Sequence, residues 1–147
     1  MDFTGKVAIV TGAGGGIGEG YASAFAARGM KVVVAELNEA GGERVAAAIR
    51  ARGGEALFVR TDVTDKASVE AAVVAAVVAF GGLDILINNA FVPTPNVLLE
   101  DKTDEMLERT LKSTVFASWW AMKAALPHMR KRGGGKVVNF YSIDVEL

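Results

Sequence analysis

Short apolar runs rich in valine and isoleucine alternate along the chain with segments in which apolar residues recur at helical spacing. A short continuous apolar run bounded by turn residues is typical of a strand that is buried on both faces. The runs that fit this description are Lys6–Thr11, Lys31–Glu36, Ala56–Arg60, Leu83–Asn88 and Lys136–Tyr141. The pattern therefore predicts five buried strands.

The segments between these runs predict four helices, most of them followed by glycines that favour the end of a helix. We expect a first helix with Ile17, Tyr21, Ala22 and Phe25 on one side that ends near Gly29, a second from about Ala40 to Ala51, a third that Thr64 or Asp65 caps and that continues to Phe80, and a long fourth that follows a proline-bearing loop (Phe91–Lys102) and ends near Pro127 to Arg132.

Regular alternation of strand and helix predicts an α/β fold, in which helices cover both faces of a parallel sheet. Crossovers in such sheets are right-handed, and the natural strand order for a doubly wound sheet is 3-2-1-4-5. Ligands bind there beyond the carboxyl ends of the strands, near the switch between the first and fourth. We expect one domain, residues 1–147, with its site at that edge.

Composition narrows the possible partners. The chain has 16 Lys and Arg against 17 Asp and Glu, a net charge of -1, which argues against nucleic acid or an anionic membrane surface as a partner. It has no cysteine and a single histidine, His128, so we expect no metal site built on thiolates or on a histidine cluster. The first residues lack an apolar leader and Ala71–Phe80, the longest apolar run, is short of the ~20 residues that span a bilayer, so we expect a cytoplasmic protein.

Glycine is concentrated in TGAGGGIG, Thr11–Gly18, between the first strand and the first helix. A helix amino terminus offers unpaired N–H groups and a partial positive charge, which suit a phosphate, and glycine lets the backbone approach it closely. A tight turn without a ligand would need fewer glycines. The dinucleotide pattern G-x-G-x-x-G fails at Ile17, and the P-loop pattern fails because no lysine follows.

The spacing that does fit is T-G-x-x-x-G-x-G, formed by Thr11, Gly12, Gly16 and Gly18. It resembles the short-chain dehydrogenase/reductase family, whose Rossmann-like domain binds NAD(H) or NADP(H) on such a loop. The resemblance places the cofactor phosphates on Gly12, Gly14, Gly15, Gly16, Ile17 and Gly18.

Glu36 ends the second strand and indicates which cofactor is used. A carboxylate there accepts hydrogen bonds from the ribose hydroxyls and repels a 2′-phosphate, and Leu37 and Asn38 supply no cation. We therefore expect NAD. A solvated turn carboxylate is the alternative reading of Glu36.

Further motifs cover essentially the whole chain. Asp62 and Val63 resemble the family's adenine-binding pair, and Asn88-Asn89-Ala90 resembles its N-N-A-G motif, in which Asn89 would contact the cofactor beside Ala90. Structural readings stay open for both: Asp62 as a cap before a helix, and Asn89 as a loop residue that bridges strands. Phe91 replaces the glycine of the family motif and adds bulk near the expected nicotinamide pocket.

The resemblance also implies catalytic roles. Ser142 matches the serine that holds the substrate oxygen, and Thr114 stands where the family has an asparagine that supports a water relay. The family's acid–base tyrosine is followed four residues later by a lysine, but Tyr21 and Tyr141 are followed by Phe25 and Val145. We expect that pair beyond Leu147, so that this chain is the cofactor-binding part of a longer protein and is inactive alone.

The predicted function is an NAD-dependent oxidoreductase acting on a small alcohol or carbonyl substrate. The alternatives are a non-catalytic NAD-binding module, which Thr114 and Phe91 favour, and a receiver-like phosphate-sensing domain, which the lack of an acidic cluster after the first strand disfavours. The resemblance further implies a homo-oligomer, a dimer or tetramer. Of Trp119 and Trp120 on the fourth helix, we expect one in the core and one on the surface.

Overall fold

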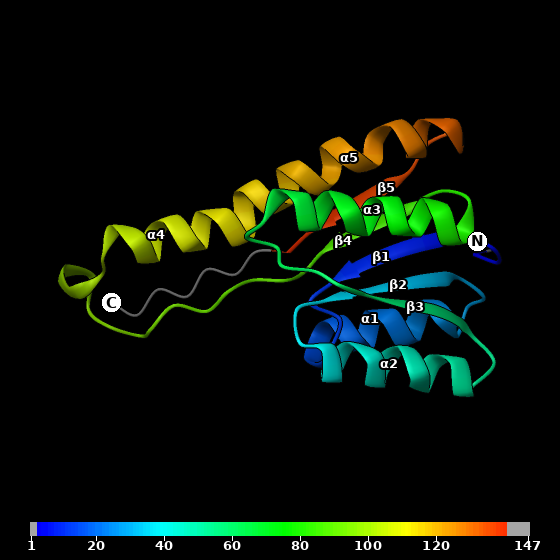
Figure 1. The fold of residues 1–147 in the computed structure, drawn as a ribbon, viewed down its shortest axis with the longest axis horizontal. Coiled ribbons are helices and arrows are strands. Elements are labelled where there is room, and N and C mark those ends of the chain that lie inside the picture. The colour runs from blue at the N-terminus through cyan, green and yellow to red at the C-terminus, as the bar shows by residue number, and fades with distance from the viewer. Residues whose placement is uncertain (1–2, 141–147) are drawn as a thin grey trace.

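The computed structural model describes residues 3–140. Five parallel strands form one sheet in the order β3-β2-β1-β4-β5, as the sequence predicts (Figure 1). The strands are β1 (Val7–Thr11), β2 (Lys31–Glu36), β3 (Glu55–Arg60), β4 (Ile85–Asn88) and β5 (Lys136–Asn139). Val10 of β1 lies opposite Val34 on one side and Ile87 on the other, so β1 is the centre of the sheet.

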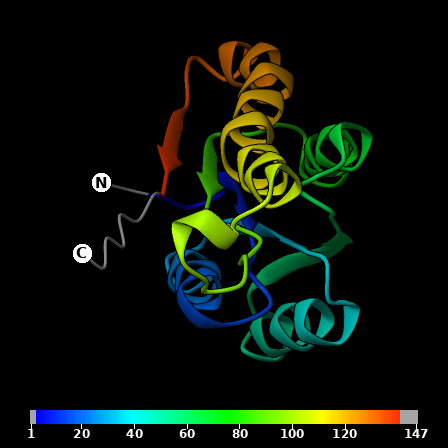
Figure 2. The ribbon, with the colours of Figure 1, turned by 90° about the vertical axis from the view of Figure 1, so that its left-hand side faces the viewer.

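Helices cover both faces of this sheet, as Figure 2 shows. The helical elements are α1 (Gly16–Ala26), α2 (Glu39–Ala51), α3 (Lys66–Phe80), the short η1 (Leu99–Asp101), α4 (Asp104–Leu111), η2 (Lys112–Phe116) and α5 (Ala117–Lys131). Residues at the helix ends place α2 and α3: Asn38 and Asp65 cap them with their side chains, and Gly81 ends α3 with a φ of 80°. Within residues 3–140, the helices are too short or too polar to pass through a lipid bilayer.

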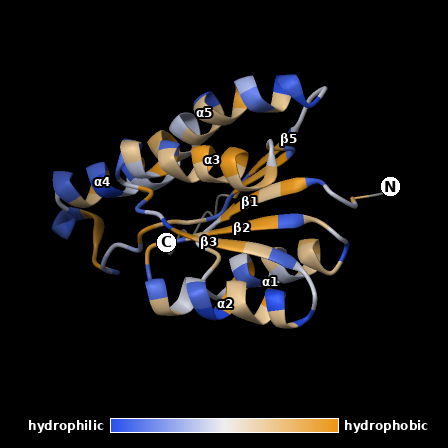
Figure 3. Ribbon diagram, turned by 45° about the vertical axis from the view of Figure 1, so that its right-hand side comes forward, coloured by the Kyte–Doolittle hydropathy of each residue, from blue (hydrophilic) through white to orange (hydrophobic). Residues whose placement is uncertain are grey.

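Alternate residues of the central strands divide the core into two halves. Val7 and Ile9 of β1 face α3 and α5, whereas Ala8 and Val10 face α1 and α2. All four are buried, and Figure 3 shows the apolar strands lying between the two layers of helices. Burial on both faces explains why the strands read as continuous apolar runs.

The long fourth helix differs from the expectation. It consists of α4 and α5 joined by η2, a π-helical turn, and α4 extends past the carboxyl edge of the sheet (Figure 1). The hydroxyls of Ser113 and Thr114 both donate to the carbonyl of Thr110, at 3.1 and 2.7 Å. Side-chain bonds to a helix carbonyl compete with the regular i→i−4 ladder, which accounts for the wider turn.

The two tryptophans of α5 differ in exposure, as expected. Trp119 is 58% exposed, and Trp120 is partly buried against the core beneath α3 and α5. Trp119 continues an exposed apolar stripe along α4, η2 and α5 that also contains Leu107, Leu111 and Val115.

A buried carboxylate joins the elements at the amino edge of the sheet. Asp84 accepts hydrogen bonds from the Val7 N–H at 2.9 Å, from Arg132 Nη2 at 2.8 Å and from Lys6 Nζ at 3.2 Å. Burial raises the pKa of Asp84, but these hydrogen bonds outweigh it and hold the pKa below its ordinary value. This cluster lies at the opposite end of the strands from the predicted site, so its role is structural.

Strand β5 is an edge of the sheet in the described part of the chain, where it pairs with β4. Val137 and Val138 are 38% and 42% exposed, and Tyr21 of α1 packs its ring against Phe140 at 5.3 Å. This edge of the sheet therefore carries partly exposed apolar side chains.

Candidate functional site

A cleft of about 490 Å³ lies along the carboxyl edge of the sheet. It runs across the ends of β1, β2, β3 and β4, where the doubly wound topology predicts a ligand. It is lined by Gly12, Gly15, Gly16, Ile17, Gly18, Glu36, Leu37, Thr61, Asp62, Val63, Asn89, Ala90, Phe91, Val92, Pro93 and Arg109.

The glycine-rich loop forms the wall of the cleft at the start of α1. Gly12 and Gly16 have φ of 65° and 53°, values that favour glycine. A Cβ on Gly18 would lie 2.2 Å from the Gly12 carbonyl oxygen, so the loop packs directly on the first turn of the helix. Gly15 is the N-cap and gives α1 no side-chain cap. The first N–H groups of α1 thus meet the cleft at its glycine-rich wall, a suitable place for an anion.

Gly14 has a different place from its neighbours in the loop. It does not line the cleft as the described residues form it, and a Cβ there would lie 2.6 Å from Glu36 Cγ. Arg44 of α2 donates to the Gly14 carbonyl at 3.1 Å and to Glu19 of α1 at 2.7 Å. The hydrogen bond from Arg44 lowers the pKa of Glu19, so this pair is ionised at neutral pH. Through its bond to the Gly14 carbonyl, Arg44 also fixes the glycine loop to α2.

Glu36 connects the end of β2 to the same loop. Its Oε2 accepts from the Gly14 N–H and its Oε1 accepts from the Asn38 N–H, each at 3.0 Å. The half-buried side chain also lines the cleft. Glu36 is therefore a structural partner of the glycine loop as well as a cleft carboxylate, which the solvated-turn reading omits.

Asn89 and Ala90 hold the loop from the side of β4. Asn89 Nδ2 donates to the carbonyls of Thr11 and Gly12, at 3.0 and 3.4 Å. The Thr11 hydroxyl accepts from the backbone N–H groups of both Asn89 and Ala90 at 3.0 Å. Asn89 therefore bridges the ends of β4 and β1, as one of its two readings proposed, and it also lines the cleft.

Asp62 and Val63 follow β3 and lie together in the cleft. Asp62 Oδ1 accepts from the backbone N–H and the hydroxyl of Thr64, at 2.8 and 2.7 Å, which shapes the approach to α3. Val63 is 8% exposed and belongs to the core under α3 and α5. Asp62 therefore stabilises the turn before α3, as its structural reading proposed, and it also lines the cleft.

Of the two residues with expected catalytic roles, Thr114 is the one that the structure describes. Thr114 lies in η2, does not line the cleft as the described residues form it, and donates its hydroxyl to Thr110. Ser142 lies outside the described residues. Phe91 stands in the cleft wall and is 67% exposed.

Several lining residues escaped sequence reasoning, among them Thr61 and Arg109. Arg109 is the one basic side chain among the described residues that line the cleft. It comes from α4, which no strand-end rule selects, and only the extension of α4 past the sheet brings it there. Thr61 directly precedes Asp62 at the end of β3, so the strand-end rule could have found it.

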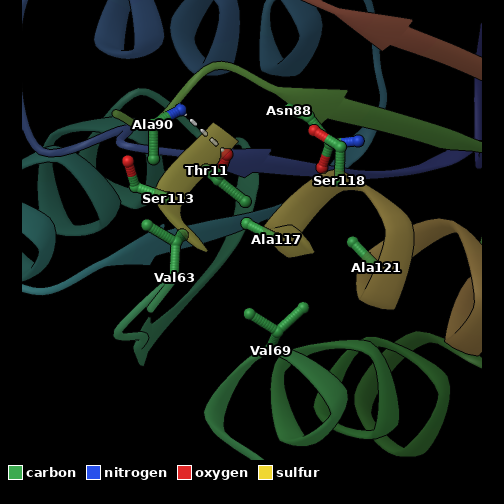
Figure 4. Close-up of a pocket in the computed structure, with 9 residues that line it drawn as sticks. All are labelled: Thr11, Val63, Val69, Asn88, Ala90, Ser113, Ala117, Ser118 and Ala121. Carbon is green, nitrogen blue, oxygen red and sulfur yellow. Dashed lines mark hydrogen bonds between the residues drawn. The ribbon is translucent and has the colours of Figure 1, made fainter. Parts of the chain in front are cut away.

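A small cavity of about 10 Å³ lies between the sheet and α5 (Figure 4). Ala90 and Val63 separate it from the cleft, because both residues line both spaces. Its other lining residues are Thr11, Val69, Asn88, Ser113, Ala117, Ser118 and Ala121. Its volume suits at most one water molecule, so the cleft is the candidate ligand site.

The comparisons with known proteins agree with this geometry. Residues 6–146 match the family model described as short chain dehydrogenase. A 2,5-dichloro-2,5-cyclohexadiene-1,4-diol dehydrogenase of Sphingobium indicum is 43% identical over 139 residues, which are 95% of this chain and 55% of that protein. A cis-4-hydroxycyclohexanecarboxylate dehydrogenase of Sinomonas cyclohexanicum is 40% identical over 141 residues, 96% of this chain and 56% of that protein.

A solved structure of 7 alpha-hydroxysteroid dehydrogenase complexed with NADH and 7-oxo glycochenodeoxycholic acid superposes with a TM-score of 0.86. It is 35% identical and covers 92% of this chain and 52% of its own. The chain thus spans about half the length of the curated relatives it matches.

Proposed function

The chain belongs to the short-chain dehydrogenase family, and on that premise we propose that the protein containing it transfers hydride between NAD(H) and an alcohol or carbonyl substrate. The observation that carries the proposal is the cleft itself. It joins the uncapped amino terminus of α1, the glycines before it and the Glu36 carboxylate in one continuous surface.

The residues of the cleft suit the parts of a dinucleotide. The N–H groups at the start of α1 would bind the pyrophosphate, and Glu36 would accept hydrogen bonds from the adenosine ribose. Asp62 and Val63 would flank the adenine, with Asn89 and Ala90 beside the cofactor. The bound nicotinamide would supply the hydride donor or acceptor.

We propose NAD rather than NADP because the Glu36 carboxylate lines the cleft at the end of β2, where the adenosine ribose would bind. A 2′-phosphate placed near Glu36 would meet a like charge, and Leu37 and Asn38 beside it are uncharged. Glu36 already accepts two backbone N–H groups, and an ionised carboxylate has about four acceptor sites, so some remain for ribose hydroxyls.

Fluorescence titration with NADH and with NADPH tests the cofactor part of this proposal. We expect NADH to bind about tenfold more tightly or better, a difference of ~1.4 kcal/mol. Glu36→Ala should reduce the difference in affinity between NADH and NADPH. Equal affinity for the two cofactors in the unaltered chain would contradict the NAD assignment, and absence of binding to either would contradict the proposed function.

The catalytic part of the proposal needs residues outside the described range. Ser142 would hold the substrate oxygen and Thr114 would take the relay position, and an acid–base group completes the reaction. Oxidation of a panel of cyclic secondary alcohols by the full-length protein with NAD tests this part. If the protein binds NADH but oxidises none of these alcohols, the alternative of a non-catalytic binding module is supported. The hydrogen bond from Thr114 to the Thr110 carbonyl favours that alternative.

The proposal includes a homo-oligomer, a dimer or tetramer, located in the cytoplasm where nicotinamide cofactors are available. Its support is the exposed stripe of Leu107, Leu111, Val115 and Trp119, since contiguous apolar surface of this kind is typical of protein interfaces. Light scattering should show the mass fall for Trp119→Glu. Leu99→Glu, which changes an exposed leucine outside the stripe, is the control.

A further inference from the structure

Ser113 is a buried polar residue for which the proposed function has no role. It is 1% exposed and lies in the π-helical turn η2, next to Thr114. A half-exposed hydroxyl such as that of Thr114 can exchange a protein hydrogen bond for one to water. The buried Ser113 hydroxyl cannot, so loss of its partners would leave a polar group unsatisfied.

The Ser113 hydroxyl joins two segments that are far apart in the chain. Its oxygen accepts from the Val92 backbone N–H at 3.3 Å, and it donates to the Thr110 carbonyl at 3.1 Å. One hydroxyl can do both at once, because it carries one donor and two acceptor sites. The loop after β4 is thereby attached to the π-helical turn.

The attached loop segment is a wall of the cleft. Phe91, Val92 and Pro93 all line it, and none of them belongs to a helix or strand. Figure 4 shows Ser113 beside Ala90, with which it also shares the small cavity behind that wall. A loop without ladder hydrogen bonds depends on such side-chain contacts for a fixed position.

We propose that Ser113 is a positioning residue for the cofactor site, which fixes the backbone of Phe91–Pro93 at the cleft. This inference rests on the proposed function. The π-helical turn η2 contributes to this positioning because it contains Ser113. The hydroxyls of Ser113 and Thr114 in this turn both donate to the Thr110 carbonyl. Ser113 touches no ligand in this role and acts through the loop.

The test compares Ser113→Ala with Ser118→Ala. Ser118 lines the same small cavity from the start of α5 but, among the described residues, is not bonded to the loop. We expect S113A to raise the dissociation constant for NADH about five- to tenfold, because NADH would then have to order the loop that the hydrogen bond no longer holds. S118A should stay within about twofold of the unaltered chain, the range of a near-neutral change.

Hydrogen exchange at the Val92 amide reports the contact directly. It should be slow in the unaltered chain and in S118A and fast in S113A, and Ser113→Thr, which keeps the hydroxyl, should restore both protection and affinity. In the full-length enzyme, S113A should raise KM for NADH with little change in kcat, which a general loss of folded protein would not produce.

The outcomes separate the two proposals. NADH binding by S113A within twofold of the unaltered chain, at a temperature where both are folded, would overturn the role of Ser113 and leave the proposed function standing. Absence of NADH binding by the folded, unaltered full-length protein would overturn both. Should S113A not fold, Ser113→Cys replaces it, with an expected two- to fivefold increase because a thiol is a weaker acceptor, and an unchanged affinity would overturn the inference.

Discussion

Gly15→Ala separates the two readings of the glycine-rich loop, a phosphate cradle and a tight turn. Gly15 has φ and ψ of -176° and 177°, an extended conformation that alanine adopts, and a Cβ there would meet no atom within 4 Å. The turn itself therefore does not require glycine at this position. A ligand lying against the backbone would require it.

The expected effect on folding is small because two contributions oppose each other. Alanine in place of glycine restricts the unfolded chain and stabilises by about 0.4–1 kcal/mol. Alanine is also the poorer N-cap, which costs about 0.5 kcal/mol. The net change in the free energy of unfolding should stay within about 0.5 kcal/mol. The added methyl group, in contrast, occupies the cleft side of the loop, where Gly15 is a lining residue.

We expect NADH affinity to fall about tenfold to a hundredfold in Gly15→Ala, since a displaced charge-assisted contact is worth ~1.5–3 kcal/mol. NADH fluorescence and thermal unfolding are measured on the same samples. Gly20→Ala is the matched control, because a Cβ at Gly20 also meets open space but the residue lies in α1 away from the cleft. Unchanged affinity in Gly15→Ala would refute the phosphate cradle and favour the tight turn.

Three further changes probe the packing and the charges. Gly18→Ala should destabilise the chain by about 3 kcal/mol in chemical denaturation, because its Cβ would lie 2.2 Å from the Gly12 oxygen. Asp84→Asn should cost about 2–3 kcal/mol near neutral pH. Because the pKa of Asp84 is lowered by folding, its contribution is present above about pH 4 and is lost as pH falls through the folded-state value, so the variant and the unaltered chain should converge in acid. Arg109→Ala should weaken NADH binding about two- to fivefold at low salt and less at high salt, whereas the distant Arg130→Ala should not.

The sheet and its order could be predicted from the sequence because the relevant forces are local or topological. Valine-rich runs such as Lys31–Glu36 have a strand's composition and length, and the glycines after α2 and α3 mark where helices end. Right-handed crossovers then leave few arrangements. The ends of strands shifted by a residue or two, as for β4, which begins at Ile85 after the Asp84 carboxylate has bonded the start of β1.

The parts that the sequence did not predict depend on contacts between distant segments. Ser113 and Val92 are 21 residues apart, and nothing in the helical pattern of α4 and α5 distinguishes Ser113 from an ordinary helix serine. Arg109 reaches the cleft only because α4 projects past the sheet. Both follow from how a helix is placed on the sheet, which apolar spacing does not specify.

Glu36 shows why structural and ligand-binding readings of one residue need not exclude each other. Its carboxylate accepts the Gly14 N–H and thereby holds the loop whose outer face, at Gly15 and Gly16, lines the cleft. The same carboxylate lines the cleft where a ribose would lie. A direct hydrogen bond therefore joins Glu36 to the glycine loop, so a ligand that touched both would meet groups that are already held together. A preorganised unit of this kind loses little entropy when a ligand spans it, which is a physical reason for a glycine loop and an acidic strand end to occur together.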